Sequence, residues 1–324
     1  MDPTVVGAWI AACVSVLTLI GTVITQIIGF RVSSRDAEKT AEEQRKQLDR
    51  TLAEQRTRTL NERFATAAEQ LGSDKPAVQL AGVYAMAGLA DDWGESRQTC
   101  VDVLCAYLQL PYVPDPGSDA PERQRLAFLA RRKVRHTIIR VITAHLKRDA
   151  AVSWQGLTFG FNGVVFDGGD FRDAEFSGGS AVFDNADFSS GTVSFSRAKF
   201  SGGAVYFGGA KFSGGRVRFA DAEFSGSRVS FRLIELSAGQ IDFEGTRFSG
   251  STVSFHDARF SGGKVGFGGA RFSGGEISFR GAQFSGGTVD FSAADDWSVP
   301  PEFPWAATPP SGVSLPEKGD QPTA

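Results

Sequence analysis

The residues that could bind a metal ion or act as nucleophiles are few and far apart in this chain of 324 residues; they are Cys13, Cys100, Cys105, His136, His145 and His256. Their spacing fits neither a zinc site nor a disulfide framework. The cysteines are explained as small core residues in a reducing compartment. The histidines are explained as exposed or hydrogen-bonded side chains. We therefore predict no metal site and no bound cofactor.

Serine and glycine are abundant, but their pattern does not fit catalysis. Ser-Gly-Gly recurs at twelve-residue intervals with no helix after it, whereas a phosphate-binding loop opens a helix. The chain contains no Gly-x-Ser-x-Gly motif and no paired-carboxylate pocket. We therefore predict no catalytic residues and a protein that is not an enzyme.

One segment, 121–148, has the charge needed to bind an anionic partner. Its basic residues, which only Glu122 opposes, are Arg123, Arg125, Arg131, Arg132, Lys133, Arg135, Arg140, Lys147 and Arg148. Such a helix fits anionic lipid headgroups or nucleic acid. A solvated face beside acidic residues such as Asp91, Asp92 and Glu95 is the alternative, and both interpretations stay open.

A twelve-residue repeat governs the second half of the chain. Large residues recur every twelve positions from Phe176 to Phe284, with Leu236 in place of one Phe, and again from Phe183 to Phe291. A smaller apolar residue, mostly Ala or Val, precedes each by two positions. Because a two-residue offset places side chains on one face of an extended segment, both point inward, and stacked units share a core.

The charges between these apolar positions indicate how many units form one coil. Read every twelve residues, like charges would stack; read every twenty-four, as in Glu175, Lys199, Glu223 and Arg247, the signs alternate. We therefore predict two 12-residue units per coil, four faces, about five coils and a core about 24 Å tall.

At this point the chain resembles the pentapeptide-repeat family, whose signature is Ala-x-Leu/Phe at five-residue intervals. Phe161, Phe166, Phe171 and Phe176 keep this spacing, whereas later units insert two residues. The resemblance, over residues 155–291, implies an all-β solenoid: a right-handed quadrilateral β-helix. It implies no particular activity. Some family members mimic DNA, but this region carries 13 basic and 14 acidic residues, so mimicry and nucleic-acid binding are disfavoured as roles for it.

An uncharged run from Val5 to Phe30 precedes a basic segment that includes Arg31 and Arg35. Its length is sufficient for a single membrane span, and the positive-inside rule places the rest of the chain in the cytoplasm. A helical stalk then begins at Ser33 or Ser34 and ends near Gly72. It resembles a weak coiled coil, so homo-oligomerisation through it stays open.

The remaining segments are predicted from helix signals and from the need to cover the solenoid ends. Helices starting near Pro76, Ser96 and Pro121 form a small bundle, to which the last of them contributes an apolar set that includes Leu126, Leu129 and Val134. The segment from Leu60 to Leu89 looks like the domain found in bacterial membrane-anchored pentapeptide-repeat proteins. Trp154 and the last helix are expected to cover one end, and Trp297, Phe303 and Trp305 the other. The tail from Pro309 should be disordered. The predicted domains are residues 1–31 (anchor), 32–72 (stalk), 73–152 (helical), 153–298 (solenoid) and 299–324 (cap and tail).

The sequence thus predicts a non-enzymatic scaffold that presents a rigid solenoid to an unknown protein partner at the cytoplasmic face of the cell membrane, with membrane lipid as a second partner. The alternative is a nucleic-acid-related role, through the basic segment 121–148 or through DNA mimicry by the solenoid.

Overall fold

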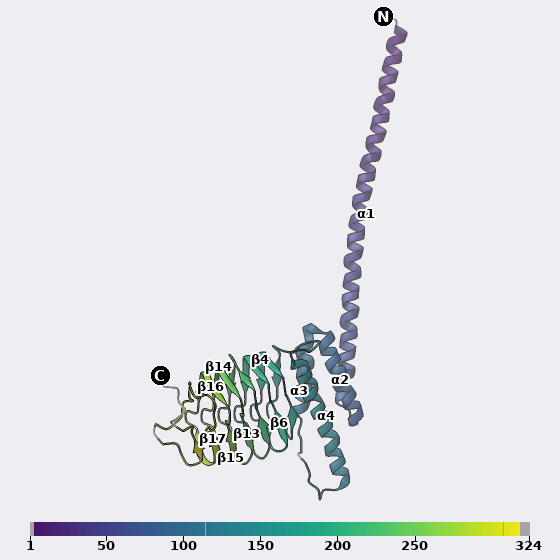
Figure 1. Ribbon diagram of the computed structural model, residues 1–324. Helices are drawn as coiled ribbons and strands as arrows, with labels where there is room; N and C mark the ends of the chain where they lie inside the picture. Colours follow the sequence, from purple (N-terminus) through teal and green to yellow (C-terminus); the bar gives the residue numbers. More distant parts are fainter. Residues whose placement is uncertain (1–2, 114, 307, 318–324) are drawn as a thin grey trace. The chain divides into compact units, whose positions relative to one another are not determined.

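The computed structural model describes residues 3–113, 115–306 and 308–317, without the side chains of residues 3–6, 8, 10–13 and 27–39. The chain forms two compact units, Met1–Glu62 and Arg63–Ala324. Four α-helices precede a long stack of parallel strands (Figure 1). The prediction of a β-solenoid after amino-terminal helices is confirmed.

The first helix, α1 (Pro3–Leu71), is continuous where the sequence predicted a span followed by a separate stalk. Among the residues whose placement is described, no helix is long and apolar enough to cross a membrane. The predicted span Val5–Phe30 is therefore not found. Within it, side chains are described only for Gly7, Trp9 and residues 14–26, and the others lie outside the described part.

The helical domain contains α2 (Pro76–Asp92), the short 3-10 helix η1 (Gly94–Ser96), α3 (Arg97–Gln109) and α4 (Glu122–Leu146). All three predicted helices form, and Pro76 occupies the first turn of α2 as expected. The last turns of α1 pack on α2 at Gly82, where any side chain would overlap the backbone of Leu71.

The core of this bundle differs from the prediction at two positions. Leu126 and Leu129 were expected on the buried face of α4, but they are 58% and 52% exposed. The buried residues of α4 begin only at Val134. Both leucines lie on the side of α4 opposite its buried residues, whereas the loop that contains Tyr112 packs on Phe128 on the other side of these turns.

The solenoid consists of two parallel sheets that face each other across the core. The strands of the first sheet are β1 (Thr158–Gly160), β4 (Glu175–Val182), β7 (Lys199–Tyr206), β10 (Glu223–Phe224), β11 (Arg228–Ser230), β14 (Arg247–Ser254) and β16 (Arg271–Ser278). Those of the second are β2 (Val165–Phe166), β3 (Gly169–Asp170), β5 (Asp187–Phe188), β6 (Thr192–Ser194), β8 (Lys211–Phe212), β9 (Arg216–Arg218), β12 (Glu235–Leu236), β13 (Gln240–Asp242), β15 (Arg259–Gly266), β17 (Gln283–Asp290) and β18 (Val313–Ser314).

The strand register confirms a coil of two repeat units. Glu223 lies between Lys199 and Arg247 in the ladder, and each of these neighbours is two repeat units away along the chain. The solenoid has about six turns rather than the predicted five. The first coil, which begins at β1, is slightly shorter than those that follow, as the pairing of Thr158 with Ser180 shows, and β18 adds a final rung.

Stacked phenylalanine rings fill the solenoid. The Phe207 ring lies 4.7 Å from that of Phe183 and 4.8 Å from that of Phe231, centroid to centroid, and nearly parallel to both. Phe207 is fully buried, as are its equivalents in neighbouring coils. Corners need a backbone that only glycine adopts easily: at Gly263, φ is +70° and an added Cβ would overlap the Gly239 carbonyl oxygen.

Side chains from the helices cover the amino-terminal end of the solenoid. Trp154 is fully buried there, as predicted, but α3 covers the end together with α4. Polar side chains of both helices hydrogen-bond the exposed edge of the first coil, which satisfies backbone groups that would otherwise lack partners. Gln98 donates to the carbonyl of Thr158, Gln109 to that of Gly160, Arg135 to that of Val165 and Thr143 to that of Asp170.

The other end is covered as predicted. Trp297 packs on Phe272, Phe303 on Phe279 and Trp305 on Phe284, with ring centroids 5.1 to 5.6 Å apart. The expected disorder from Pro309 is wrong for the part described, because β18 pairs with β17 and the Phe291 N–H donates to the Ser314 carbonyl. Residues 318–324 lie outside the described residues.

Candidate functional site

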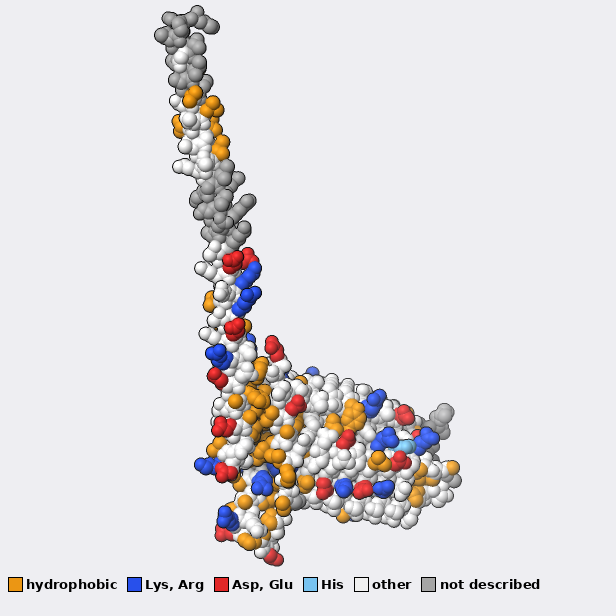
Figure 2. Space-filling model, turned by 180° about the vertical axis from the view of Figure 1, so that it is seen from behind, with side chains coloured by type: hydrophobic (Ala, Val, Ile, Leu, Met, Phe, Trp, Pro, Cys, Tyr) orange, Lys and Arg blue, Asp and Glu red, His pale blue; other side chains and the backbone are white. Residues whose placement is uncertain are grey.

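The outward-facing side chains of the solenoid form columns along its length. In two columns the charges alternate except where Arg271 follows Arg247. Ion pairs connect successive coils: Lys199 with Glu175 at 3.7 Å, Arg247 with Glu223 at 3.8 Å and Arg259 with Glu235 at 3.1 Å. Figure 2 shows such a row of alternating acidic and basic side chains. Each exposed pair contributes little energy, so the main effect of these columns is to favour the correct register.

One corner of the solenoid departs from this alternation. Arg232, His256 and Arg280 occupy equivalent positions on three successive coils, and backbone hydrogen bonds connect these coils. His256 has an acidic neighbour, Asp257, at 3.2 Å. In the described part of the chain, neither arginine forms an ion pair with a carboxylate.

Leu233, at the same corner, has a conformation that leucine adopts rarely. Its φ is +59° and its side chain is 50% exposed. The equivalent positions in other coils hold Asn185, Gly209, Asp257 and Gly281, residue types that tolerate the left-handed region. An exposed leucine here costs conformational energy without adding to the core. We name Arg232, Leu233, His256 and Arg280 the basic corner.

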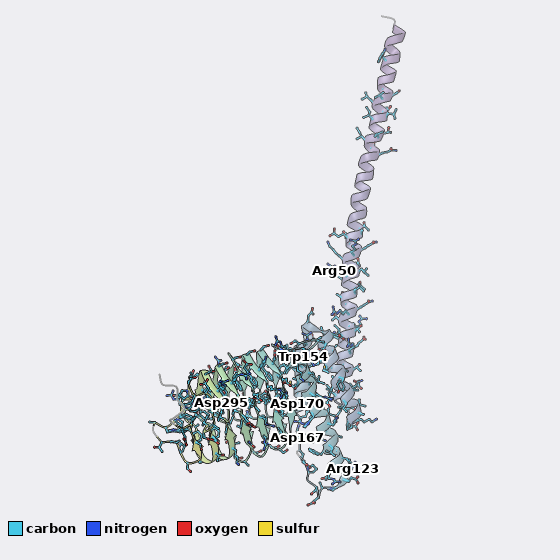
Figure 3. The ribbon with its side chains drawn as sticks, in the orientation of Figure 1. Arg50, Arg123, Trp154, Asp167, Asp170 and Asp295 are labelled. Carbon is cyan, nitrogen blue, oxygen red and sulfur yellow. The ribbon has the colours of Figure 1, made fainter. Side chains whose placement is uncertain are left out.

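The junction of α4 with the solenoid contains a buried charged cluster around Asp167 (Figure 3). Its carboxylate accepts hydrogen bonds from the Tyr112 hydroxyl at 2.6 Å and from Arg132 Nε at 3.0 Å. The other oxygen lies 2.9 Å from His136 Nε2. Burial alone would raise the pKa of Asp167, but the hydrogen bonds from His136 and Tyr112 outweigh it, so the pKa is lowered.

Arg135 completes this cluster. Its side chain is almost fully buried, and its guanidinium lies 4.1 Å from the centroid of the Tyr112 ring. It donates to the carbonyls of Leu108, at 2.7 Å, and of Val165, at 2.8 Å. Because the buried polar groups of the cluster are engaged with the protein itself, we assign it the task of fixing α4 on the solenoid.

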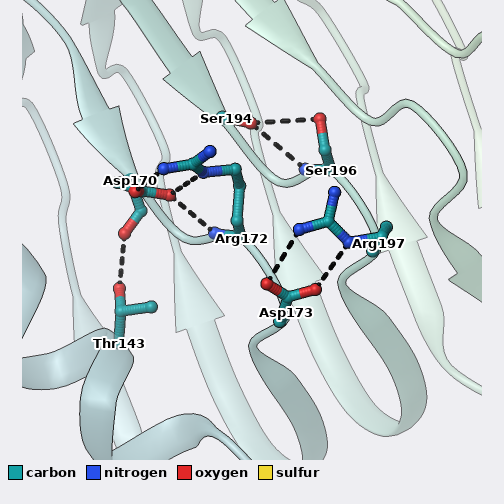
Figure 4. A network of polar contacts seen from close by, with 7 residues as sticks. All are labelled: Thr143, Asp170, Arg172, Asp173, Ser194, Ser196 and Arg197. Carbon is teal, nitrogen blue, oxygen red and sulfur yellow. Dashed lines mark hydrogen bonds and ion pairs between the residues drawn. The ribbon is translucent and has the colours of Figure 1, made fainter.

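A second polar network lies beside it on the lateral face (Figure 4). Arg172 binds Asp170 through two nitrogens, at 2.6 and 2.8 Å, and Arg197 binds Asp173 on the preceding coil at 2.8 and 2.9 Å. The hydrogen bonds from these arginines lower the pKa values of Asp170 and Asp173. A cleft of about 320 Å³ opens here, lined in addition by Arg140 and other residues of α4.

The basic residues of 121–148 therefore divide into two groups. Arg132 and Arg135 hold the solenoid, and His145 on the same helix lies 3.1 Å from Asp91. The others point outward, and Arg123 lies at the far end of α4 (Figure 3). Of the acidic neighbours proposed for a merely solvated face, Asp91 contacts His145 and Trp154, and Asp92 forms an ion pair with Arg63.

The cysteines occupy core positions where they are described. Cys100 and Cys105 are buried, and burial raises the pKa of Cys105 to about 12, which suppresses its thiolate. Cys13 lies outside the described side chains. Within the described residues no group of histidine, cysteine or carboxylate side chains could hold a metal ion.

Sequence reasoning did not identify the Asp167 cluster or the basic corner. Asp167 and Tyr112 come from segments separate from α4, which carries Arg132 and His136, so no local pattern connects the four. The basic corner could have been found, because Arg232, His256 and Arg280 follow the period of the coil.

Comparison with known proteins supports the repeat assignment. The family model described as pentapeptide repeats (9 copies) matches residues 161–204 and 240–295. The stretch between them, 205–239, forms coils in the same register of two repeat units per coil. No curated protein and no solved structure matches the chain. The matched part of the solenoid is therefore similar to pentapeptide repeats, as the spacing of Phe161, Phe166, Phe171 and Phe176 predicted.

Proposed function

We propose that this protein is a non-enzymatic scaffold whose solenoid binds another protein through the basic corner. The observation that carries the proposal is the combination of two arginines on either side of His256, neither ion-paired in the described part of the chain, with an exposed left-handed leucine. The arginines gain no ion-pair energy within this part, and an exposed leucine with positive φ costs about 1–2 kcal/mol. Neither feature adds to folding stability, and backbone strain like that of Leu233 concentrates at functional sites.

The chemistry of the corner indicates the kind of partner. Arg232 and Arg280 would pair with carboxylates, and Leu233 would be covered by an apolar side chain. Such a surface fits an acidic protein segment that contains at least one apolar residue. Arginine together with a central apolar contact is typical of the residues that dominate binding energy in protein interfaces.

The proposal also places the protein at a membrane, with the body in the cytoplasm. This part rests on the sequence alone: the uncharged run Val5–Phe30 and the basic residues that follow it. Flotation of the full-length chain with phosphatidylcholine vesicles, in the presence of carbonate, tests it. Recovery at the bottom of the gradient would exclude membrane insertion.

A capture experiment with matched variants tests the binding function. Full-length protein, R232E/R280E and the control R216E/K264E are used as baits. Each variant reverses two exposed cations that lie two coils apart, and the control pair lies on a different face from the basic corner. We expect a partner captured by the wild type and by the control but lost with R232E/R280E. Equal recovery with all three baits, or no specific partner at all, would contradict the proposal. If labelled duplex DNA binds at low salt and R232E/R280E abolishes that binding, the alternative nucleic-acid role is favoured instead.

A further inference from the structure

The outer face of α4 exposes apolar and basic side chains together. Leu126, Leu129, Lys133 and Arg140 follow one another at intervals of three, four and seven positions, which places them on one side of the helix, and Lys147 comes directly after the helix end. All five are exposed, while the opposite side of the helix from Val134 onward is buried. We name these five residues the outer face.

Tyr84 extends this surface from α2. Its ring is 53% exposed, and its hydroxyl accepts a hydrogen bond from Arg140 Nη2 at 2.6 Å. The outer face thus combines two leucines and three cations with a neighbouring tyrosine. Figure 2 shows hydrophobic and basic side chains close together on the helical part of the molecule.

Folding stability does not explain this arrangement. Arg123 and Arg125 lie in the first turn of α4, where the helix dipole disfavours cations. Leu126 and Leu129 point away from the loop that packs on Phe128 in the same turns and are more than half exposed, so they gain little from burial. The exposure of these residues therefore needs an explanation other than folding stability. A ligand that contacts apolar and cationic side chains at the same time provides one.

We propose that the outer face of α4 lies on the surface of an anionic lipid membrane. Amphipathic helices that bind at membrane interfaces carry leucine or aromatic residues on the buried side and Lys or Arg beside them. Tyrosine is favoured at the same depth. A nucleic acid would engage the cations but leave both leucines in water, so lipid fits the whole set better. The inference deepens the membrane placement proposed above, yet it can fail independently of it.

The test uses the full-length chain with an environment-sensitive fluorophore. Leu129 is replaced by a labelled cysteine in a chain whose native cysteines are alanine, and the same label at Val299, which is 42% exposed and lies outside both proposed surfaces, is the control. Vesicles of phosphatidylcholine alone, or with three-tenths phosphatidylglycerol, are added. We expect a blue shift and higher emission at position 129 with the anionic vesicles only, reversed by about 0.5 M salt, and no change at position 299.

Charge variants measure the contribution of the cations. Each basic residue near an anionic surface contributes about a fivefold gain in binding, so K133Q/R140Q should raise the lipid concentration at half-maximal response about 25-fold. The variant R216Q/K264Q, altered on the solenoid, should leave it unchanged. An equal effect of both variants would contradict the assignment to α4.

Absence of a response at position 129 to anionic vesicles would overturn the proposal. A response to duplex DNA instead of vesicles would overturn it in favour of nucleic acid. A response that depends on protein concentration without lipid would overturn it in favour of a second copy of this chain on the outer face. Flotation with phosphatidylcholine vesicles separates the two membrane claims. A chain that floats without any response at position 129 retains the anchor and loses the outer-face contact.

Discussion

Replacing Asp167 by asparagine should loosen the attachment of the helical domain to the solenoid. The substitution keeps the size of the side chain but removes its charge. The carboxylate now accepts from Tyr112, Arg132 and His136 at 2.6 to 3.0 Å, and its side chain is only 5% exposed. An amide has one acceptor oxygen, and its NH₂ group would face donors, so at least one of these contacts must be lost.

The magnitude follows from burial. Hydrogen bonds to a charged group contribute about 1.5–3 kcal/mol each, and breaking a buried ion pair costs about 3–5 kcal/mol. Arg132 is 41% exposed and can regain water, which reduces the cost. We therefore expect D167N to lower the free energy of unfolding by about 3 kcal/mol at pH 7. Urea unfolding followed by tryptophan fluorescence measures this, because Trp154 lies at the same junction.

The same variant has a defined pH dependence. The pKa of Asp167 is lower in the folded than in the unfolded chain, so the unfolded chain binds more protons as the pH falls below about 4. The stabilisation from this carboxylate is present above the unfolded pKa and is lost as the pH falls through the folded pKa. The difference between wild type and D167N should therefore shrink from pH 7 to pH 3. A difference that stays constant, or one below about 1 kcal/mol at pH 7, would refute this account of the cluster.

Three further predictions concern the solenoid, each measured by urea or thermal unfolding of the full-length protein. F207A removes a fully buried ring between two others and should cost about 3–5 kcal/mol, whereas F207L should cost less than about 1.5 kcal/mol; similar losses would contradict the ring-stack description. G263A forces alanine into positive φ against a carbonyl and should cost at least about 2 kcal/mol, and an unchanged midpoint would show that the corner can relax. K199E places a third carboxylate between Glu175 and Glu223 and should cost about 1 kcal/mol or less at low salt, diminishing as salt is added; an effect independent of salt would exclude repulsion as its cause.

The solenoid could be predicted because its sequence repeats the same local requirements. The phenylalanines marked the core, and the alternating charges of Glu175, Lys199 and Glu223 indicated the two-unit coil that the ladder confirms. Helix ends were predictable for a similar reason, since Pro76 and Gly72 act locally.

The differences arise where distant segments meet. Leu126 and Leu129 are apolar like Val134 but lie on the opposite, exposed side of α4, and only the packing of the helix on its neighbours decides which side is buried. The donors to Asp167 come from a loop and from α4, and only the fold brings them together. The tail lacks a repeat, yet β18 forms because the last coil leaves backbone groups that need partners.

The two-unit coil has a consequence for how this protein can change in length during evolution. Duplicating or deleting a whole coil leaves every downstream surface on its original side of the axis. Duplicating a single repeat unit would satisfy the phenylalanine pattern and the core equally well, but it would move every later surface residue half a turn around. Arg280 would then leave the side that carries Arg232, and the basic corner would be divided between opposite sides. Homologues that retain this surface should therefore differ in solenoid length by whole coils.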